Sequence, residues 1–187
     1  MAFIGVQASY SNAPAVAYAG MVADAGWVLD AKTLISAEAS AQIPFGVAVA
    51  FKPSPTYDTD ATMPANSTDL VAGIFVHAPG YERTFTATLP DGTAGTVGEL
   101  GATGVLPGAV LSVMRKGRTW VKVEDGCAVG DRLFVRYSAN GANTQLGSCR
   151  ASADAGFTTD LTKVGQYLTS ASAGGLAMLE VDFTNKP

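Results

Sequence analysis

Charged side chains are scarce in this sequence of 187 residues. Asp, Glu, Lys and Arg make up 15% of the chain, against a usual share of roughly 25%. A disordered chain needs high charge and low hydrophobicity, and a coiled coil needs abundant Glu, Lys, Leu and Arg, so the composition excludes both classes.

Long hydrophobic runs are also missing, although the mean hydropathy is +0.21. The longest apolar stretches are Ile43–Phe51 and Leu70–Ala78. Each is about half of the roughly 20 residues that a membrane-spanning helix needs. We therefore expect a soluble, mostly β protein with an unusually neutral surface.

The chain has only two cysteines, Cys127 and Cys149, and they lack the spacing of a metal site or a redox motif. We expect two free thiols in a protein made inside a cell, and a single disulfide is the alternative. Because the first basic residue is Lys32, the N-terminus lacks the positive region of a signal peptide.

Residues that carry chemistry are equally few. The single histidine, His77, lies in an apolar stretch without a second histidine to share a metal. Asp58, Asp60 and Asp69 lack the glycine and the closing glutamate of a calcium loop. No GxSxG, HExxH or phosphate-binding glycine motif is present. We expect no catalytic activity, no cofactor and no metal.

Excess positive charge is absent as well, since the net charge is −4 and the isoelectric point about 4.8. Binding to nucleic-acid phosphates needs a basic face, so it is disfavoured. One local concentration of bases is either a solvated hairpin face or a patch that docks on an acidic partner. It consists of Arg115, Lys116, Arg118, Lys122, Arg132 and Arg136.

What the sequence does contain is a series of short apolar runs separated by turn signals. This pattern predicts an all-β fold, either a compact small β-barrel or a β-sandwich, with an extended N-terminal arm and long loops. Strands are expected near 43–51, 70–78, 83–88, 132–137, 164–170 and 176–183. Turns are expected at 90–92, 130–131 and 140–141.

Two further segments have definite expectations. Residues 109–125 alternate on both sides of Lys116-Gly117, which predicts a β-hairpin that turns there. Within it, Val121 and Val123 face one way and Lys122 faces the other. Residues 52–69 are rich in Pro, Ser, Thr and Asp, and they predict a long surface loop.

The charge deficit is concentrated at one end, because residues 1–23 contain no charged side chain. We interpret residues 1–20 as an extended arm and residues 21–187 as the β domain. A division of that domain into two packed subdomains, about 21–104 and 105–187, is left open. Trp27 and Trp120 are expected in the core, whereas Phe3, Tyr10 and Tyr18 are expected either at a partner interface or packed on their own domain.

Five segments follow one another in a characteristic order: AVAYAGMVADAG, IPFGVAVAF, LVAGIFVHAPGYE, VLPGAVLSVMRKGRTWVKVEDGCAVGDRLFVRYSANG and VGQYLTSASAGGLAMLEVDF. Their order resembles the structural cement, or decoration, proteins of tailed-bacteriophage capsids. The segments cover most of the chain, and the resemblance rests on strand order and glycine placement.

The resemblance implies a non-enzymatic virion protein, made in the bacterial host cytoplasm and located on the outer surface of the capsid. It implies a homotrimer that binds the major capsid protein near three-fold positions and clamps neighbouring subunits, with no nucleic acid or membrane partner. An N-terminal arm would map onto Ala2–Gly20. The residues that we expect at a partner interface are Phe3, Ile4, Tyr10, Tyr18, Tyr57, Arg115, Lys116 and Arg118.

Two alternatives come from other functional classes. One is a receptor- or carbohydrate-binding virion surface protein that uses Tyr57 and the acidic residues of the 52–69 loop. The other is a hydrolase built on Asp131, Glu124 and His77, whose spacing matches no known catalytic motif.

Overall fold

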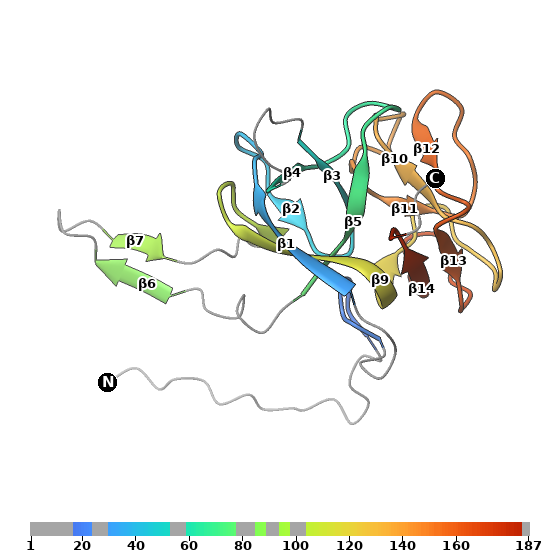
Figure 1. Ribbon diagram of the computed structural model, residues 1–187, viewed down its shortest axis with the longest axis horizontal. Helices are drawn as coiled ribbons and strands as arrows, with labels where there is room; N and C mark the ends of the chain where they lie inside the picture. Colours follow the sequence, from blue (N-terminus) through green and yellow to red (C-terminus); the bar gives the residue numbers. More distant parts are fainter. Residues whose placement is uncertain are drawn as a thin grey trace.

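The computed structural model describes residues 17–23, 30–52, 59–77, 85–88, 94–97 and 104–184, with the backbone alone at 85–88 and 94–97. Fourteen strands and no helix occur in these ranges, which confirms the expected all-β fold (Figure 1). Within them, no helix is long and apolar enough to cross a membrane.

Five strands close into a barrel. They are β1 (Asp30–Ser36), β4 (Asp60–Thr62), β3 (Ala48–Phe51), β5 (Val71–Val76) and β9 (Val110–Lys122). Neighbours pair in this order, and β1 pairs with β9 to close the ring. Only the β1–β4 pair among these five is parallel. The fold is therefore a small barrel, one of the two architectures that the sequence predicts.

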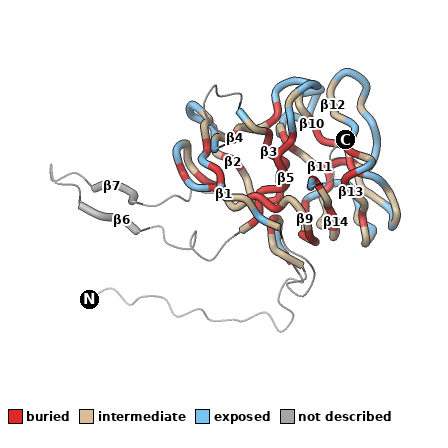
Figure 2. The backbone as a smooth tube through the Cα atoms, in the orientation of Figure 1, coloured by how far each residue is buried: buried red, intermediate tan, exposed pale blue. Residues whose placement is uncertain are grey.

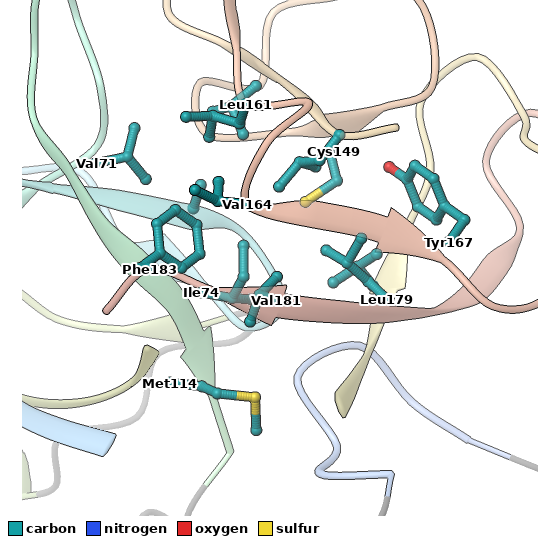
Figure 3. Packing of buried hydrophobic residues seen from close by; sticks show 14 of the residues in the cluster. Val71, Ile74, Met114, Cys149, Leu161, Val164, Tyr167, Leu179, Val181 and Phe183 are labelled. Carbon is teal, nitrogen blue, oxygen red and sulfur yellow. The ribbon is translucent and has the colours of Figure 1, made fainter. Parts of the chain in front are cut away.

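The barrel wall separates two hydrophobic cores. Inside lie side chains such as Leu34, Phe75 and Val113. Outside, β5 and β9 pack against β14 (Leu176–Asp182), β13 (Gly165–Tyr167) and neighbouring C-terminal segments to form a second core (Figure 3). All six residues of β5 are buried, because its two faces meet different cores (Figure 2).

Shorter strands complete the structure. β10 (Phe134–Arg136) pairs with β11 (Cys149–Arg150) on one side and with β12 (Thr158–Asp160) on the other. Two separate pairs are β2 (Ile43–Pro44) with β8 (Gly104–Val105), and β6 (Phe85–Thr88) with β7 (Ala94–Val97).

The expected C-terminal turns are confirmed. Asn140 and Asn143 exchange backbone hydrogen bonds of 2.9 and 3.0 Å around Gly141-Ala142. Gly130 has a φ of 94° in its turn, a conformation that glycine adopts without steric cost. The turn expected at 90–92 lies outside the described residues. Both cysteines are free thiols, as expected, and Cys149 is fully buried.

The expected hairpin at 109–125 is wrong, because β9 runs straight through Lys116-Gly117 as one strand of 13 residues. Lys116 lies opposite Asp30 of β1 on one side and opposite Asp182 of β14 on the other. Gly117 continues the strand with a φ of 144°, in a backbone region that residues with a side chain rarely adopt. The strand is thereby shared between the barrel and the second core.

The expected long loop at 52–69 is wrong over Asp60–Thr62, which form β4 and complete the barrel wall. Ala61 is fully buried inside the barrel. With one apolar residue between two polar ones, so short a strand carries too little alternation to be recognised. Residues 53–58 lie outside the described part of the chain.

Candidate interaction surface

The N-terminal segment 17–23 is attached to β9 as an additional short strand. Val22 and Thr119 form an antiparallel bridge, and Thr119 faces Leu179 of β14 on its other side. Val22 also packs against the second core. The segment is fixed by four hydrogen bonds to β9: Gly20 N–H to Trp120 O (2.7 Å), Trp120 N–H to Met21 O (2.9 Å), Ala23 N–H to Arg118 O (2.9 Å) and Thr119 Oγ1 to Met21 O (3.0 Å).

The same segment contacts the end of β5. The backbone N–H of His77 donates to the carbonyl of Gly20 at 2.8 Å. The ring of Tyr18 meets the His77 ring edge-on, with centroids 5.4 Å apart, and Phe45 lies 4.8 Å from the same His77 ring. Because Tyr18 is still 52% exposed, it can pack on His77 and also contact a partner.

The predicted interface residues Lys116 and Arg118 lie in a ladder of ion pairs between β9 and β14. Lys116 Nζ is 2.7 Å from Asp182, and Arg118 Nε is 2.8 Å from Glu180. Each pair lies directly opposite in the strand register. The hydrogen bond from Lys116 lowers the pKa of Asp182 to about 2, with a smaller effect from Thr184. The two pairs carry no net charge.

The other predicted interface residues divide into two sets. Arg115 lies on the same strand and donates from Nη2 to the carbonyl of Phe183 at 3.4 Å. The remaining four, Phe3, Ile4, Tyr10 and Tyr57, lie outside the described residues. Both Tyr18 and Arg118 contribute to the attachment of the segment 17–23, since Tyr18 packs on His77 and the Arg118 carbonyl accepts the N–H of Ala23. An interface role for these residues stays a prediction.

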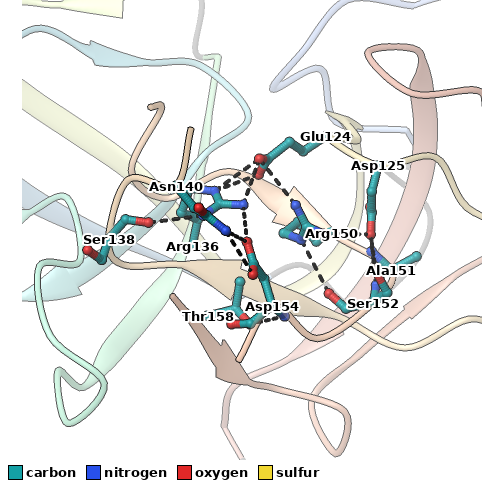
Figure 4. Close-up of polar contacts among 10 residues, drawn as sticks. All are labelled: Glu124, Asp125, Arg136, Ser138, Asn140, Arg150, Ala151, Ser152, Asp154 and Thr158. Carbon is teal, nitrogen blue, oxygen red and sulfur yellow. Dashed lines mark hydrogen bonds and ion pairs between the residues drawn. The ribbon is translucent and has the colours of Figure 1, made fainter. Parts of the chain in front are cut away.

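A buried ionic cluster links three segments of the C-terminal half (Figure 4). The Arg136 side chain has no exposed surface, and it pairs with Glu124 at 2.8 Å and with Asp154 at 2.9 Å. Arg150 adds ion pairs to Glu124 at 3.2 Å and to Asp125 at 3.3 Å. Since these charges are hydrogen-bonded to one another, the cluster holds the three segments together.

A cleft of about 590 Å³ opens beside the N-terminal segment. Ala19, Phe45, Val47, Lys122 and Gln145 are among its lining residues. The two charged residues of the lining are Lys122 and Glu124, and Glu124 is already paired with Arg136 and Arg150. Among the described residues, no group of three or more His, Cys, Asp or Glu could hold a metal ion.

The expectation that Trp120 packs in the core is wrong, because it is half-buried on the outer face of β9 and belongs to neither core. Sequence reasoning did not include it at the interface. The signal was present, since Val121 and Val123 face the core and alternation places Trp120 on the opposite face with Lys122. Trp27 lies outside the described residues.

These features define a small β-barrel protein whose longest strand, β9, carries a hydrogen-bonded N-terminal segment. The family described as structural cement protein (E217 gp24/Pam3 gp6) matches residues 6–182, and the chain belongs to this family. Membership assigns it a structural role in the phage virion, in association with the capsid.

Two solved structures are similar. A chain of "The capsid of Myoviridae Phage XM1" has 18% sequence identity and a TM-score of 0.58, and the match covers 97% of this chain and 98% of that one. The head fiber gp8.5 N base of bacteriophage phi29 has 14% identity and a TM-score of 0.37, with 86% and 99% covered. The first shows that the fold is shared. No curated protein matches the chain.

Proposed function

We propose that this protein binds the outer surface of the phage capsid and stabilises contacts between major capsid subunits. The observation that carries the proposal is the attachment of residues 20–23 to β9, which fixes the part of the chain that directly follows the uncharged residues 1–16. A segment without charged side chains avoids the large cost of desolvating a charge when a protein surface buries it. Residues 1–16 then act as the capsid-binding arm, which is four residues shorter than the arm of residues 1–20 expected from the sequence, because Gly20 is hydrogen-bonded to Trp120 and His77.

The protein acts as a trimer near three-fold positions of the capsid. In a trimer, three equivalent arms reach three subunits from one body, so weak contacts at each arm add to a strong attachment. The pairing of Arg118 and Lys116 with acidic residues supports a surface that meets the capsid without excess charge. No catalytic step is needed for this role.

The experiment compares the full chain with a variant that lacks residues 1–16. This deletion leaves the bonds of Gly20–Ala23 to β9 intact, so the barrel should stay folded. We expect the full chain to sediment as a trimer and to bind expanded capsids but not unexpanded procapsids. The shortened chain should bind expanded capsids poorly. Equal binding by both chains would refute the arm, and a monomer that ignores capsids would refute the whole proposal.

A further inference from the structure

A row of large apolar side chains crosses the outer face of the sheet formed by β13, β14, β9 and the N-terminal segment. Trp120 of β9 lies directly opposite Met178 of β14. Beyond β13, Leu168 donates its backbone N–H to the carbonyl of Met178 at 2.8 Å. On the other side of β9, the carbonyl of Met21 accepts the N–H of Trp120. We call Leu168, Met178, Trp120 and Met21 the apolar row.

Strand alternation places the apolar row on the face turned away from the cores. Thr119, Val121, Ala177 and Leu179 are completely buried, whereas Trp120 and Met178 between them are only half-buried. Val22 packs against the second core, so alternation places Met21 on the outer face. The row therefore presents partly exposed Trp, Met and Leu side chains across four neighbouring segments.

The edge of the row is charged but internally neutral. Arg118 with Glu180, and Lys116 with Asp182, form the next two cross-strand pairs on the same face. An apolar centre that contains Trp and Met beside ionic pairs is the usual composition of a protein interface, where Trp and Arg are the commonest strong contributors. Since the pairs are satisfied within the sheet, a partner needs to supply no compensating charge.

We propose that the apolar row docks on an uncharged, apolar patch of a major capsid subunit, as a second contact beside the arm. This inference rests on the proposed function. The occupant follows from membership of a phage structural cement family and from chain connectivity, since Met21 lies five residues after the proposed arm of residues 1–16. In this arrangement the folded sheet would provide most of the binding surface, and the arm would extend the contact to parts of the capsid further away.

The experiment uses the full chain and expanded capsids stripped of it. Trp120→Glu places a charge at the centre of the row and should weaken capsid binding about tenfold or more, with the same oligomer by sedimentation velocity. Val110→Glu is the matched control. Val110 is an apolar residue of the same strand, 39% exposed and ten residues away, or roughly 33 Å. The control should bind like the wild type.

A second measurement covers the case in which Trp120→Glu fails to fold. A photo-crosslinking amino acid at position 178 should form a covalent adduct with the major capsid protein, identified by mass spectrometry. Binding should also change little between low and moderate salt, because the row is apolar and its neighbouring charges are paired.

Each contrary result has its own meaning. Wild-type binding by Trp120→Glu, a steep loss of binding with salt, or no capsid adduct from position 178 would overturn the apolar row as a capsid contact. A smaller oligomer in Trp120→Glu would show that the row joins copies of this chain, which also overturns it. If the wild type itself ignores capsids, the proposed function fails first, and the inference fails with it.

Discussion

Gly20 and Gly46 face each other so closely that neither position has room for a side chain. A β-carbon on Gly46 would lie 2.9 Å from the backbone nitrogen of Gly20, and one on Gly20 would lie 3.0 Å from that of Gly46. Their φ angles are 81° and 79°, in the left-handed region. This contact seats the N-terminal segment against the turn that precedes β3.

Gly46→Ala should therefore destabilise the fold by more than its backbone conformation alone explains. Gly108 is the matched control, because its φ is also 79° but a β-carbon there would meet nothing within 4 Å. Gly108→Ala should cost about 1 kcal/mol for the left-handed backbone. In urea unfolding, we expect a clearly larger loss of unfolding free energy for Gly46→Ala than for Gly108→Ala. Equal losses would show that small shifts of the neighbouring atoms make room for the added β-carbon.

The buried Arg136 gives the second prediction. Arg136→Met leaves Glu124 and Asp154 without their shared cation, and breaking a buried pair in this way costs about 3–5 kcal/mol. Arg132→Met is the control, because Arg132 is exposed and close by in the chain. Its free energy of unfolding should change by no more than about 0.5 kcal/mol. Similar values for both variants would contradict the structural role of the cluster.

Acid should weaken the ladder between β9 and β14. The pKa of Asp182 is held at about 2, below the ordinary value for an aspartate of about 3.9. A lowered pKa in the folded state means that the stabilisation is present above about pH 4 and is lost as the pH falls toward 2. NMR titration of the Asp182 carboxyl carbon should give a pKa near 2 in the wild type and a higher value in Lys116→Met. An ordinary pKa in the wild type would contradict the prediction.

The two thiols should differ in reactivity. Burial raises the pKa of Cys149 to about 12, and burial is also the main cause that raises the pKa of Cys127. Cys127 is only partly buried, so a thiol reagent at pH 8 should modify it slowly in the native protein. Cys149 should react only after unfolding. Mass spectrometry of the labelled peptides checks this, and fast native labelling of Cys149 would show that the second core opens readily.

The sequence was sufficient for the all-β class and the C-terminal strands, because these depend on local alternation and turn residues. It was also sufficient for the free cysteines, because their number and spacing match no metal site or redox motif. The hairpin expected at Lys116-Gly117 was a misinterpretation of the same alternation. A two-residue turn there would put Lys122 opposite Leu111 and Arg115 opposite Arg118, which pairs like charges. In the continuous strand, Leu111 and Val113 pack in the barrel core, whereas Val121 packs in the second core.

Other features could not be predicted, because they depend on contacts between distant segments. Ala61 becomes a barrel residue only through pairing of β4 with β1 and β3. Similarly, nothing near Gly20 indicates that it meets Gly46, and the partners of Arg118 and Lys116 are more than 60 residues away. Of the six bases in the predicted patch, Lys116 and Arg118 lie in the neutral ladder and Arg136 lies in the buried ionic cluster.

The last prediction locates the boundary between arm and barrel. A chain that begins at residue 17 keeps all four hydrogen bonds between the N-terminal segment and β9, together with the packing of Val22 on the second core. A chain that begins at residue 24 loses them, at about 0.5–1.5 kcal/mol for each hydrogen bond.

Removal of residues 1–16 should therefore leave the free energy of unfolding unchanged, while removal of 1–23 should lower it by several kcal/mol. Urea unfolding of both chains and of the full chain makes the comparison. A stable chain that begins at residue 24 would mean that segment 17–23 is a removable part of the arm. In that case Met21 would reach the capsid as part of the arm, and the sheet face would have to bind through Trp120 and Met178 alone.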